Sequence, residues 1–245
     1  MNRMTAIVKS IPFSSALFYS DLRAIGGKAA QLIGASRGQL FDSALSPKRQ
    51  FQLISLHQMQ SFESSLAEMR LAPYIVKAMA LIGVQRRGGS NMFRHQISTL
   101  GILLDYKVID PIILKAALIH DLFEDASGLP GVSEDDITGI DRDGPQVFDL
   151  VMEVTIRTVD GIREPKPEYL LRIMQQGSPR ARLLKLADRI SNLTALGFVH
   201  DIAFVKKYVR ETSNYILPYA EAVNADMFRE LSDLVASRSK QFSEG

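Results

Sequence analysis

Apolar side chains recur every three or four residues along most of the chain after residue 60, and this spacing predicts α-helices. The pattern first covers residues 61–87, where Pro73 is expected to kink or divide the helix. Ser90 or Asn91 is then expected to cap a helix over residues 92–106. The predicted core face of that helix consists of Ile97, Leu100, Leu103 and Leu104.

The rest of the chain continues the helical pattern. Asp110 followed by Pro111 is typical of a helix start. Ser133, three residues before Asp136, resembles a capping box with Asp in place of the usual Glu. Further helices are predicted at residues 114–126, 144–156, 178–195, 202–219 and 225–237, and surface loops at residues 127–133 and 157–166. No segment shows convincing strand alternation, so we predict an all-α fold, a helical bundle.

The segment at residues 114–126 combines an apolar run with four ionisable residues, His120, Asp121, Glu124 and Asp125. On a continuous helix, residues four apart share a face, so His120 would lie over Glu124 and Asp121 over Asp125. Burying such groups beside apolar neighbours is costly unless a cation or hydrogen bonds compensate them. This crowding is the first indication of a metal site.

Composition narrows the class of protein. The chain has 245 residues, of which 46% are hydrophobic, and its mean hydropathy is +0.02. These values are typical of a globular protein with a substantial core. The absence of cysteine excludes disulfides, zinc fingers and thiol nucleophiles. No apolar run reaches the roughly 18 to 20 residues that a membrane span needs. We expect a cytoplasmic protein without a membrane partner.

Positive charge is concentrated at the start of the chain. Residues 1–50 contain seven Lys or Arg against two Asp, whereas residues 51–245 hold 22 basic and 25 acidic residues. A nucleic-acid-binding domain usually carries its positive charge on the folded body, so we expect no nucleic-acid partner. We interpret residues 1–55 as a basic, poorly ordered extension and residues 56–245 as the functional domain. A transit peptide, or a translation start at Met59, is an alternative for the first segment.

Four residues are candidates for a single metal ion: His95, the adjacent pair His120 and Asp121, and the distant Asp188. Imidazole and carboxylate ligands suit divalent metals such as Mn²⁺, Zn²⁺ or Fe²⁺. Because no thiolate is present, an open hydrolytic site is favoured over a closed structural one. Each candidate lies in an otherwise apolar predicted helix, which strengthens the interpretation.

At this point the motifs show a resemblance. The order of one His, a His-Asp pair about 25 residues later and a distant Asp resembles the HD superfamily of metal-dependent phosphohydrolases. More narrowly, RRGGSNMFRH, ALIHDLFEDA and LLKLADRISNL are similar to the hydrolase domain of the RelA/SpoT homologues, which cleave the alarmone (p)ppGpp. The similarity extends over residues 60–240, and YILPYAEAVNADMFRELSDLV resembles the closing helices of the stand-alone members, the small alarmone hydrolases.

The resemblance implies specific roles. His95, His120, Asp121 and Asp188 would bind one Mn²⁺, and Glu124 and Asp125 would orient and deprotonate water and assist the leaving group. Candidate substrate-binding residues are Arg86, Asn192, Arg157 and Lys185. Asn192 lies four residues after Asp188, on the same helix face.

Each of these residues also has a structural interpretation. Arg86 matches an arginine that contacts the guanine end of the substrate, but it could also be a surface base that closes a helix. Lys185 and Arg189 could bind phosphates or pair with surface acids, and Arg157 could also meet phosphate. Glu124 and Asp125 could be solvated residues at a helix end.

Some positions depart from the family pattern. Ala126 and Ala195 stand where threonines are common, and GSNM replaces an aromatic-containing turn at residues 89–92. These departures leave every expected metal ligand in place but bear on substrate identity.

The leading hypothesis is a Mn²⁺-dependent (p)ppGpp 3′-pyrophosphohydrolase, with homo-oligomerisation possible and with no synthetase domain expected after residue 240. The alternatives are an HD hydrolase for another nucleotide, such as an adenine alarmone or NADPH, a non-catalytic alarmone sensor, and a helical scaffold with an accidental motif.

Overall fold

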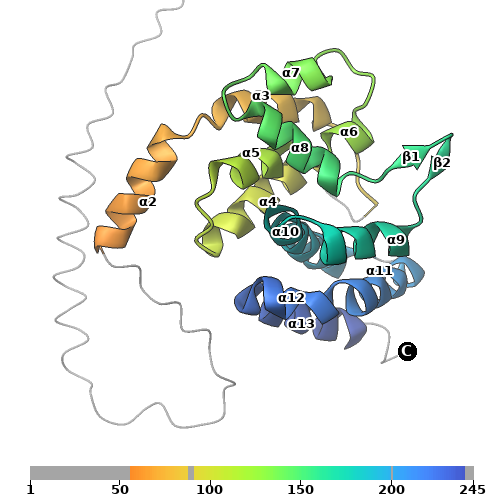
Figure 1. The fold of residues 1–245 in the computed structure, drawn as a ribbon. Helices are drawn as coiled ribbons and strands as arrows, with labels where there is room; N and C mark the ends of the chain where they lie inside the picture. Colours follow the sequence, from red (N-terminus) through yellow and green to blue (C-terminus); the bar gives the residue numbers. More distant parts are fainter. Residues whose placement is uncertain (1–55, 88–90, 200, 241–245) are drawn as a thin grey trace, which may run out of the picture. The chain divides into compact units, whose positions relative to one another are not determined.

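The computed structural model describes residues 56–87, 91–199 and 201–240, and helices make up most of these ranges (Figure 1). The predicted all-α class is therefore confirmed. The predicted basic extension, residues 1–55, lies outside the described residues, as does Ser90, one of the two candidate caps. Within the described ranges, no helix combines the length and the apolar character that a membrane crossing requires.

The elements follow one another in a simple order. The α-helices are α2 (Leu56–Glu68), α3 (Ala72–Ala78), α4 (Met92–Asp105), α5 (Pro111–Ile119), α6 (Leu122–Asp125), α7 (Glu134–Thr138), α8 (Gly144–Val154), α9 (Lys166–Leu171), α10 (Pro179–Ala195), α11 (Ile202–Tyr215), α12 (Leu217–Val223) and α13 (Ala225–Lys240). Short 3₁₀ segments cover Met79–Leu81 and Leu196–Phe198, and a π-helical segment covers Arg172–Gln176. The strands β1 (Thr158–Val159) and β2 (Ile162–Arg163) form a hairpin.

Helix α10 is the central element. It packs against α4, α5 and α8 on one side and against α12 and α13 on the other (Figure 1). Every residue from Leu184 to Ser191 is buried, which at 3.6 residues per turn means that the helix is covered on all faces. Three of these buried residues, Lys185, Asp188 and Arg189, are charged. The central helix therefore places charged side chains in the interior, where hydrogen bonds or opposite charges must offset the free-energy cost of their burial.

Helix starts follow the predicted capping residues. Asn91 accepts from the backbone N–H of Arg94, and Asp110 accepts from Ile112 and Ile113. Ser133 and Ser178 cap α7 and α10 in the same way. Such caps satisfy N–H groups that lack intrahelical partners, and they fix where each helix begins. The positions of His95 and Asp188 along their helices follow from them.

The predicted continuous helix at residues 114–126 is wrong. Helix α5 ends at Ile119, and the chain turns at His120 and Asp121 before α6 begins at Leu122. Asp121 has φ −98° and ψ 1°, outside the helical region. The rule that residues four apart share a face therefore does not apply across this break. His120 and Asp121 lie instead at the turn between two helices.

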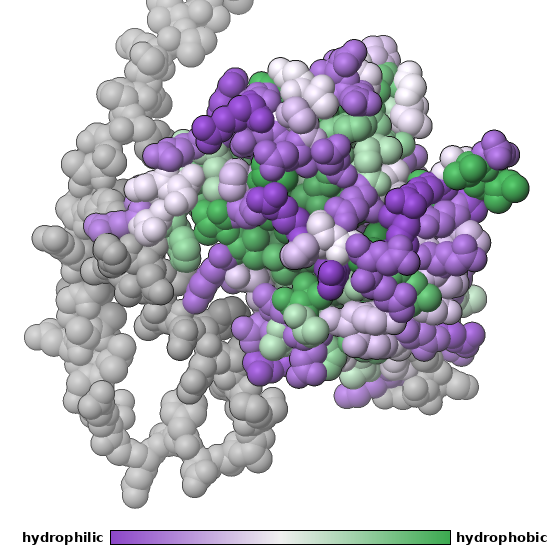
Figure 2. All heavy atoms as spheres, viewed as in Figure 1, coloured by the Kyte–Doolittle hydropathy of each residue, from purple (hydrophilic) through white to green (hydrophobic). Residues whose placement is uncertain are grey.

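The predicted loop at residues 157–166 contains a β-hairpin. Thr158 pairs with Arg163 and Val159 with Ile162. Asp160 and Gly161 both have positive φ values, 51° and 78°, as a tight two-residue hairpin turn requires. The Asp-Gly pair in the sequence favours such a turn, although we predicted only a loop there. Val159 and Ile162 are exposed, and Figure 2 shows an apolar projection where Figure 1 places the hairpin.

Two further predictions need correction, and two elements were not predicted. Ile97 is exposed, whereas Leu103 is buried as predicted and Leu100 and Leu104 pack partly buried against the core. The buried face of α4 also includes Met92, His95, Gln96 and Thr99. The predicted helix over residues 202–219 is divided at Ile216, since Pro218 lies in the first turn of α12 and lacks the N–H that a continuous helix needs. Helix α9 and the π-helical segment were not predicted, because two prolines obscured the apolar pattern there.

A buried ion network joins α5 to the turn before α8. The ammonium group of Lys115, 3% exposed, donates to Asp141 at 2.7 Å and to Asp143 at 2.6 Å. Tyr74 donates to the other oxygen of Asp141 at 2.9 Å. Breaking a buried pair leaves an uncompensated charge. The network therefore fixes the start of α8 against the core helix α5.

We expect Lys115→Met to lower the free energy of unfolding by about 3–5 kcal/mol, because two carboxylates would lose their buried cation. Denaturant unfolding measures this change. The matched control is Lys77→Met, which removes a more exposed lysine that pairs with Asp136 and should cost about 1 kcal/mol or less. Equal effects of the two substitutions would show that burial of the Lys115 network does not matter for stability.

Candidate metal centre

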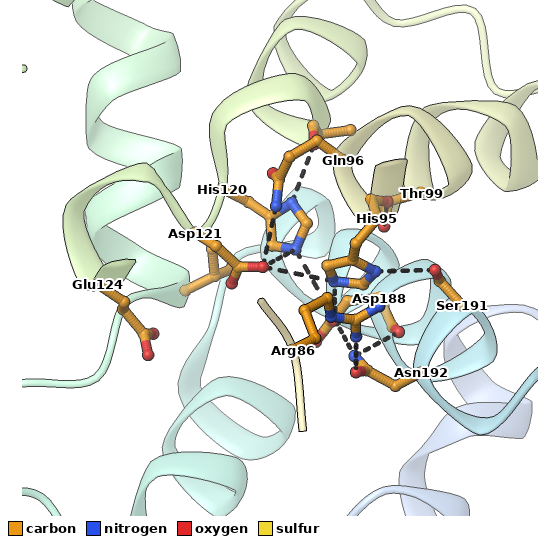
Figure 3. A network of polar contacts seen from close by, with 12 residues as sticks. Arg86, His95, Gln96, Thr99, His120, Asp121, Glu124, Asp188, Ser191 and Asn192 are labelled. Atoms are coloured by element: carbon orange, nitrogen blue, oxygen red, sulfur yellow. Dashed lines mark hydrogen bonds and ion pairs between the residues drawn. The ribbon is translucent and has the colours of Figure 1, made fainter. Parts of the chain in front are cut away.

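His95 lies in the second turn of α4 and points towards α10. Its Nδ1 is 2.8 Å from the hydroxyl of Ser191, and its Nε2 is 3.1 Å from Oδ1 of Asp188 (Figure 3). The side chain is buried, and burial lowers its pKa. His95 is therefore held as a neutral imidazole whose ring is oriented by a residue of another helix.

His120 lies at the turn between α5 and α6. Its Nδ1 is 2.9 Å from the carbonyl oxygen of Ala117. Because a carbonyl can only accept a hydrogen bond, Nδ1 carries the proton, and the lone pair of a neutral ring is on Nε2. A backbone or carboxylate partner on one ring nitrogen commonly orients a metal-ligating histidine in this way.

The two aspartates approach the same point from different elements. Oδ2 of Asp121 lies 3.2 Å from Nε2 of His120 and 3.4 Å from Nε2 of His95. Gln96 donates to that same oxygen at 2.9 Å. Oδ1 of Asp188 lies 3.8 Å from Nε2 of His120. Figure 3 shows the four side chains converging from α4, the turn after α5 and α10.

Asp188 has partners on both of its oxygens. Lys185 donates to Oδ2 at 2.7 Å, and Asn192 donates to Oδ1 and, at 2.9 Å, to the backbone carbonyl of Asp188. Although burial alone would raise its pKa, the ammonium of Lys185 and the two histidines hold the pKa well below the usual range. Asp188 therefore remains a carboxylate in the interior.

The donor set fits a divalent cation. One ligand atom from each of His95, His120 and Asp188 lies within 4.8 Å of the others, and this group could hold a metal ion. Nε2 of His120 is buried and has no hydrogen-bond partner in the described part of the chain. Burial would lower the pKa of His120, yet the neighbouring Asp121 carboxylate, with Asp188, raises it to about 10. The cluster thus attracts positive charge, and its nitrogen and oxygen donors suit a borderline divalent metal.

Glu124 and Asp125 lie beside this cluster but not in it. Figure 3 shows the Glu124 carboxylate apart from the two histidines. It accepts from the backbone N–H of Ile156 at 2.9 Å and from Arg163 of the hairpin at 3.2 Å. Burial, with the charges of Asp121 and Glu124, raises the pKa of Asp125 to about 6. The two carboxyl groups therefore differ in environment.

A pocket of about 260 Å³ is lined by His95, Asp121 and Asp188 of the cluster, though not by His120, and by Glu124 and Asp125. Its lining combines acids, bases and aromatic rings: Asp121, Glu124, Asp125, Asp188, Arg86, Arg87, Lys166, Lys185, Arg189, Tyr169, Phe204 and Tyr208, among others. A larger cavity of about 600 Å³ lies next to Lys115, where the buried charges are already paired with one another. The smaller pocket is therefore the candidate functional site.

The structure brings together most of the predicted substrate-binding residues. Arg86 donates to the side-chain oxygen of Asn192, and both line the pocket with Lys185. The surface role considered for Arg86 and Lys185 does not fit these positions. Arg157, in contrast, is exposed on the segment before β1 and does not line the pocket. Its predicted contact with phosphate has no support from its position.

Several pocket residues were not predicted from the sequence. Gln96 and Ser191 orient metal-site side chains, and Lys166, Tyr169 and Tyr208 line the pocket. Tyr169 accepts from Lys185 at 2.6 Å and donates to the carbonyl of Val154. Their helical spacing is the same as that of ordinary core or surface residues. The sequence therefore contained no separate signal for them, beyond a helical register that places Ser191 and Asp188 on adjoining turns.

Comparisons with known proteins point to one family. No protein-family model matches the chain. It is 26% identical over 206 residues to a GTP pyrophosphokinase of Streptomyces antibioticus, which covers 82% of this chain and 23% of the relative. It is 28% identical over 193 residues to the GTP pyrophosphokinase rsh of Brucella ovis, with 76% and 24% covered. The chain thus spans about a quarter of the length of these curated relatives.

Two further similarities concern hydrolases. A probable guanosine-3′,5′-bis(diphosphate) 3′-pyrophosphohydrolase of Mycoplasma pneumoniae is 31% identical over 129 residues, which cover 48% of this chain and 17% of the relative. A solved structure, described as a metazoan orthologue of SpoT that hydrolyses ppGpp, superposes with a TM-score of 0.56 at 24% identity. The match covers 68% of this chain and 93% of that one, and it establishes a shared fold.

Proposed function

We propose that this chain is a metal-dependent (p)ppGpp 3′-pyrophosphohydrolase, because its curated relatives are RelA/SpoT homologues and it shares the fold of a solved SpoT orthologue. The observation that carries the proposal is the convergence of His95, His120 and Asp188 within 4.8 Å, with Glu124 and Asp125 in the lining of the same pocket. A site for phosphate-ester hydrolysis needs a place for a divalent cation and a carboxylate that can accept a proton, and this pocket offers both.

His95, His120, Asp121 and Asp188 would hold the metal, for which Mn²⁺ is our expectation. When bound, a divalent cation lowers the pKa of water and offsets the negative charge of phosphate. Other residues orient these ligands. The Ala117 carbonyl orients His120, Ser191 orients His95 and Gln96 orients Asp121. Lys185 keeps Asp188 ionised. Ligands oriented by such partners need little rearrangement when the cation arrives.

The two carboxyl groups next to the cluster would divide the proton transfers. Water attacks the phosphorus nearest the ribose, the bond from that phosphorus to the ribose 3′ oxygen breaks, and pyrophosphate is released with GDP or GTP. Glu124, fixed by Ile156 and Arg163, takes the proton from the attacking water. Asp125, whose pKa is raised to about 6, retains a proton more readily and gives it to the departing 3′ oxygen.

Product analysis tests this proposal directly. The purified full chain, incubated with ppGpp and Mn²⁺, should release GDP and pyrophosphate in equal amounts, and EDTA should abolish the release until Mn²⁺ is returned in excess. Chromatography of the nucleotide and an enzymatic pyrophosphate assay measure the two products. Binding of ppGpp without any product would instead support an alarmone sensor. Turnover of NADPH or of an adenine alarmone, with ppGpp inert, would reassign the substrate.

A further inference from the structure

His95 has partners on both of its ring nitrogens, and these partners differ in chemistry. Nε2 lies 3.1 Å from Oδ1 of Asp188 and 3.4 Å from Oδ2 of Asp121, whereas Nδ1 lies 2.8 Å from the hydroxyl of Ser191 (Figure 3). Carboxylate oxygens only accept hydrogen bonds, but a serine hydroxyl can either donate or accept one. The Nε2 side of the ring therefore has partners with a fixed role, and the Nδ1 side does not.

The carboxylates decide where the proton of the neutral His95 ring lies in the empty site. An unprotonated Nε2 would place its lone pair against two carboxylate oxygens, and this contact is repulsive in the interior. The single N–H of the ring is therefore expected on Nε2, where it donates to Asp188. The lone pair is then on Nδ1, and the hydroxyl of Ser191 donates to it.

Cation binding through Nε2 requires the opposite arrangement. His95 binds a cation with the lone pair of Nε2, so the one proton of the neutral ring must then lie on Nδ1. The hydroxyl of Ser191 must rotate and accept from Nδ1 instead of donating to it. One side chain therefore satisfies both forms of the ring, and the number of protons on His95 does not change between them.

His120 has a different kind of partner on its Nδ1. That partner is the carbonyl oxygen of Ala117, at 2.9 Å, which can only accept, so the proton on Nδ1 of His120 stays there whether the site is empty or loaded. A backbone carbonyl or a carboxylate is the common partner of the outer nitrogen of a metal-ligating histidine. The hydroxyl beside His95 differs from both, because it permits either tautomer.

We propose that Ser191 is a positioning residue that lets His95 exchange its tautomer between the empty and the cation-loaded site. The inference deepens the proposed function and rests on it only in that the cluster binds a divalent cation. Ser191 is 7% exposed and His95 2%, so their contact lies in the interior. Without the hydroxyl, the loaded site would leave a buried N–H without an acceptor, and the empty site would leave a buried lone pair without a donor.

Nitrogen-15 NMR of the imidazole rings reports the tautomer directly, because protonated and unprotonated ring nitrogens differ in chemical shift. The full chain has four histidines, so the spectrum is simple, and His95→Gln identifies the His95 signals. Without metal, His95 should have its proton on Nε2. With Zn²⁺, a diamagnetic probe used in place of Mn²⁺, the proton should be on Nδ1. The Nδ1 proton of His120 should be present in both samples.

Calorimetric titration with Mn²⁺ measures how much the Ser191 hydroxyl contributes to binding. Ser191→Ala should weaken Mn²⁺ binding by about 10- to 100-fold, the usual effect of removing a residue that orients a metal ligand. Ser191→Thr keeps a hydroxyl and should retain most of the affinity. The matched control, Thr99→Val, removes a buried hydroxyl that donates to the backbone carbonyl of His95 and not to its ring, and it should leave the affinity unchanged.

The exchange would be refuted by the same His95 tautomer in the empty and the Zn²⁺-loaded chain, or by a doubly protonated His95 in the empty one. Unchanged Mn²⁺ affinity in Ser191→Ala, or an equal loss in Thr99→Val, would refute the role of the hydroxyl. If Ser191→Ala does not fold, as near-ultraviolet circular dichroism would reveal, the wild-type spectra decide the question. No step needs a nucleotide, so a chain that binds metal but does not hydrolyse ppGpp can still pass or fail this test.

Discussion

Asp121→Asn should lower ppGpp hydrolysis by about 10³-fold or more and should lower the bound metal per chain. The substitution keeps the shape of the side chain but removes one of the two carboxylates that face both histidines. A bound divalent ion contributes several kcal/mol of charge stabilisation during phosphate transfer, and each 1.36 kcal/mol corresponds to a factor of ten. Turnover and metal content, the latter by atomic emission, measure the two effects in one preparation.

Asp149→Asn is the matched control, since it makes the same chemical change at an exposed position of α8 that does not line the pocket. It should leave both metal content and turnover within a factor of two. Excess Mn²⁺ should restore part of the activity of Asp121→Asn if weaker metal binding is the cause. Full activity in Asp121→Asn, with metal still bound, would exclude Asp121 as a ligand.

The sequence predicted the helices well where local chemistry decides them. Asn91, Asp110 and Ser178 stand at helix starts, because their side chains satisfy backbone N–H groups whatever the tertiary structure. Periodic apolar residues then set the helices that follow. The residues expected at the metal centre came together because α4, α5 and α10 pack against one another. A helix was predicted at each of these places, although the one at α5 was predicted to continue through α6.

What the sequence could not predict depends on tertiary structure. The break at His120 and Asp121 is not marked by glycine or proline, so no local signal in the sequence predicts it. The hairpin, in contrast, contains an Asp-Gly pair, which favours a tight turn. The polar residues on either side of it made the segment resemble a loop, so the strands were not predicted. Arg189 was an ambiguous base in the sequence. Only burial by α11, with Tyr208 over it, shows that its charge has no surface partner.

The hairpin also changes the interpretation of Glu124. As a predicted helix-end residue, Glu124 could have been a solvated surface acid. In the structure its two oxygens have different partners, the backbone N–H of Ile156 and the guanidinium of Arg163. Arg163 is 66% exposed, so this ion pair is screened by solvent and contributes little to stability. The contact instead fixes the direction of the carboxylate at the edge of the pocket.

Glu124→Gln should therefore lower turnover by about 10²- to 10⁴-fold, the usual contribution of a positioned general base, while metal content and the unfolding midpoint stay near their wild-type values. The amide keeps the shape of the side chain, and its oxygen can still accept from Ile156, but it cannot take up a proton. Single-turnover kinetics with saturating ppGpp measure the change in the chemical step. Glu168→Gln, the same change at an exposed position of α9 that does not line the pocket, is the control.

Arg163→Gln separates the two roles of the Glu124 contact. If Glu124 acts as the base, loss of its exposed partner should cost only a few-fold in turnover, because the Ile156 contact still orients the carboxylate. If Arg163→Gln instead lowers turnover as much as Glu124→Gln does, the ion pair between Arg163 and Glu124, and not the carboxylate as a base, accounts for the loss. Turnover of Glu124→Gln within threefold of wild type would remove Glu124 from the mechanism. Proton transfer would then fall to Asp125, the other carboxyl group proposed for these transfers, whose raised pKa keeps it partly protonated near neutral pH.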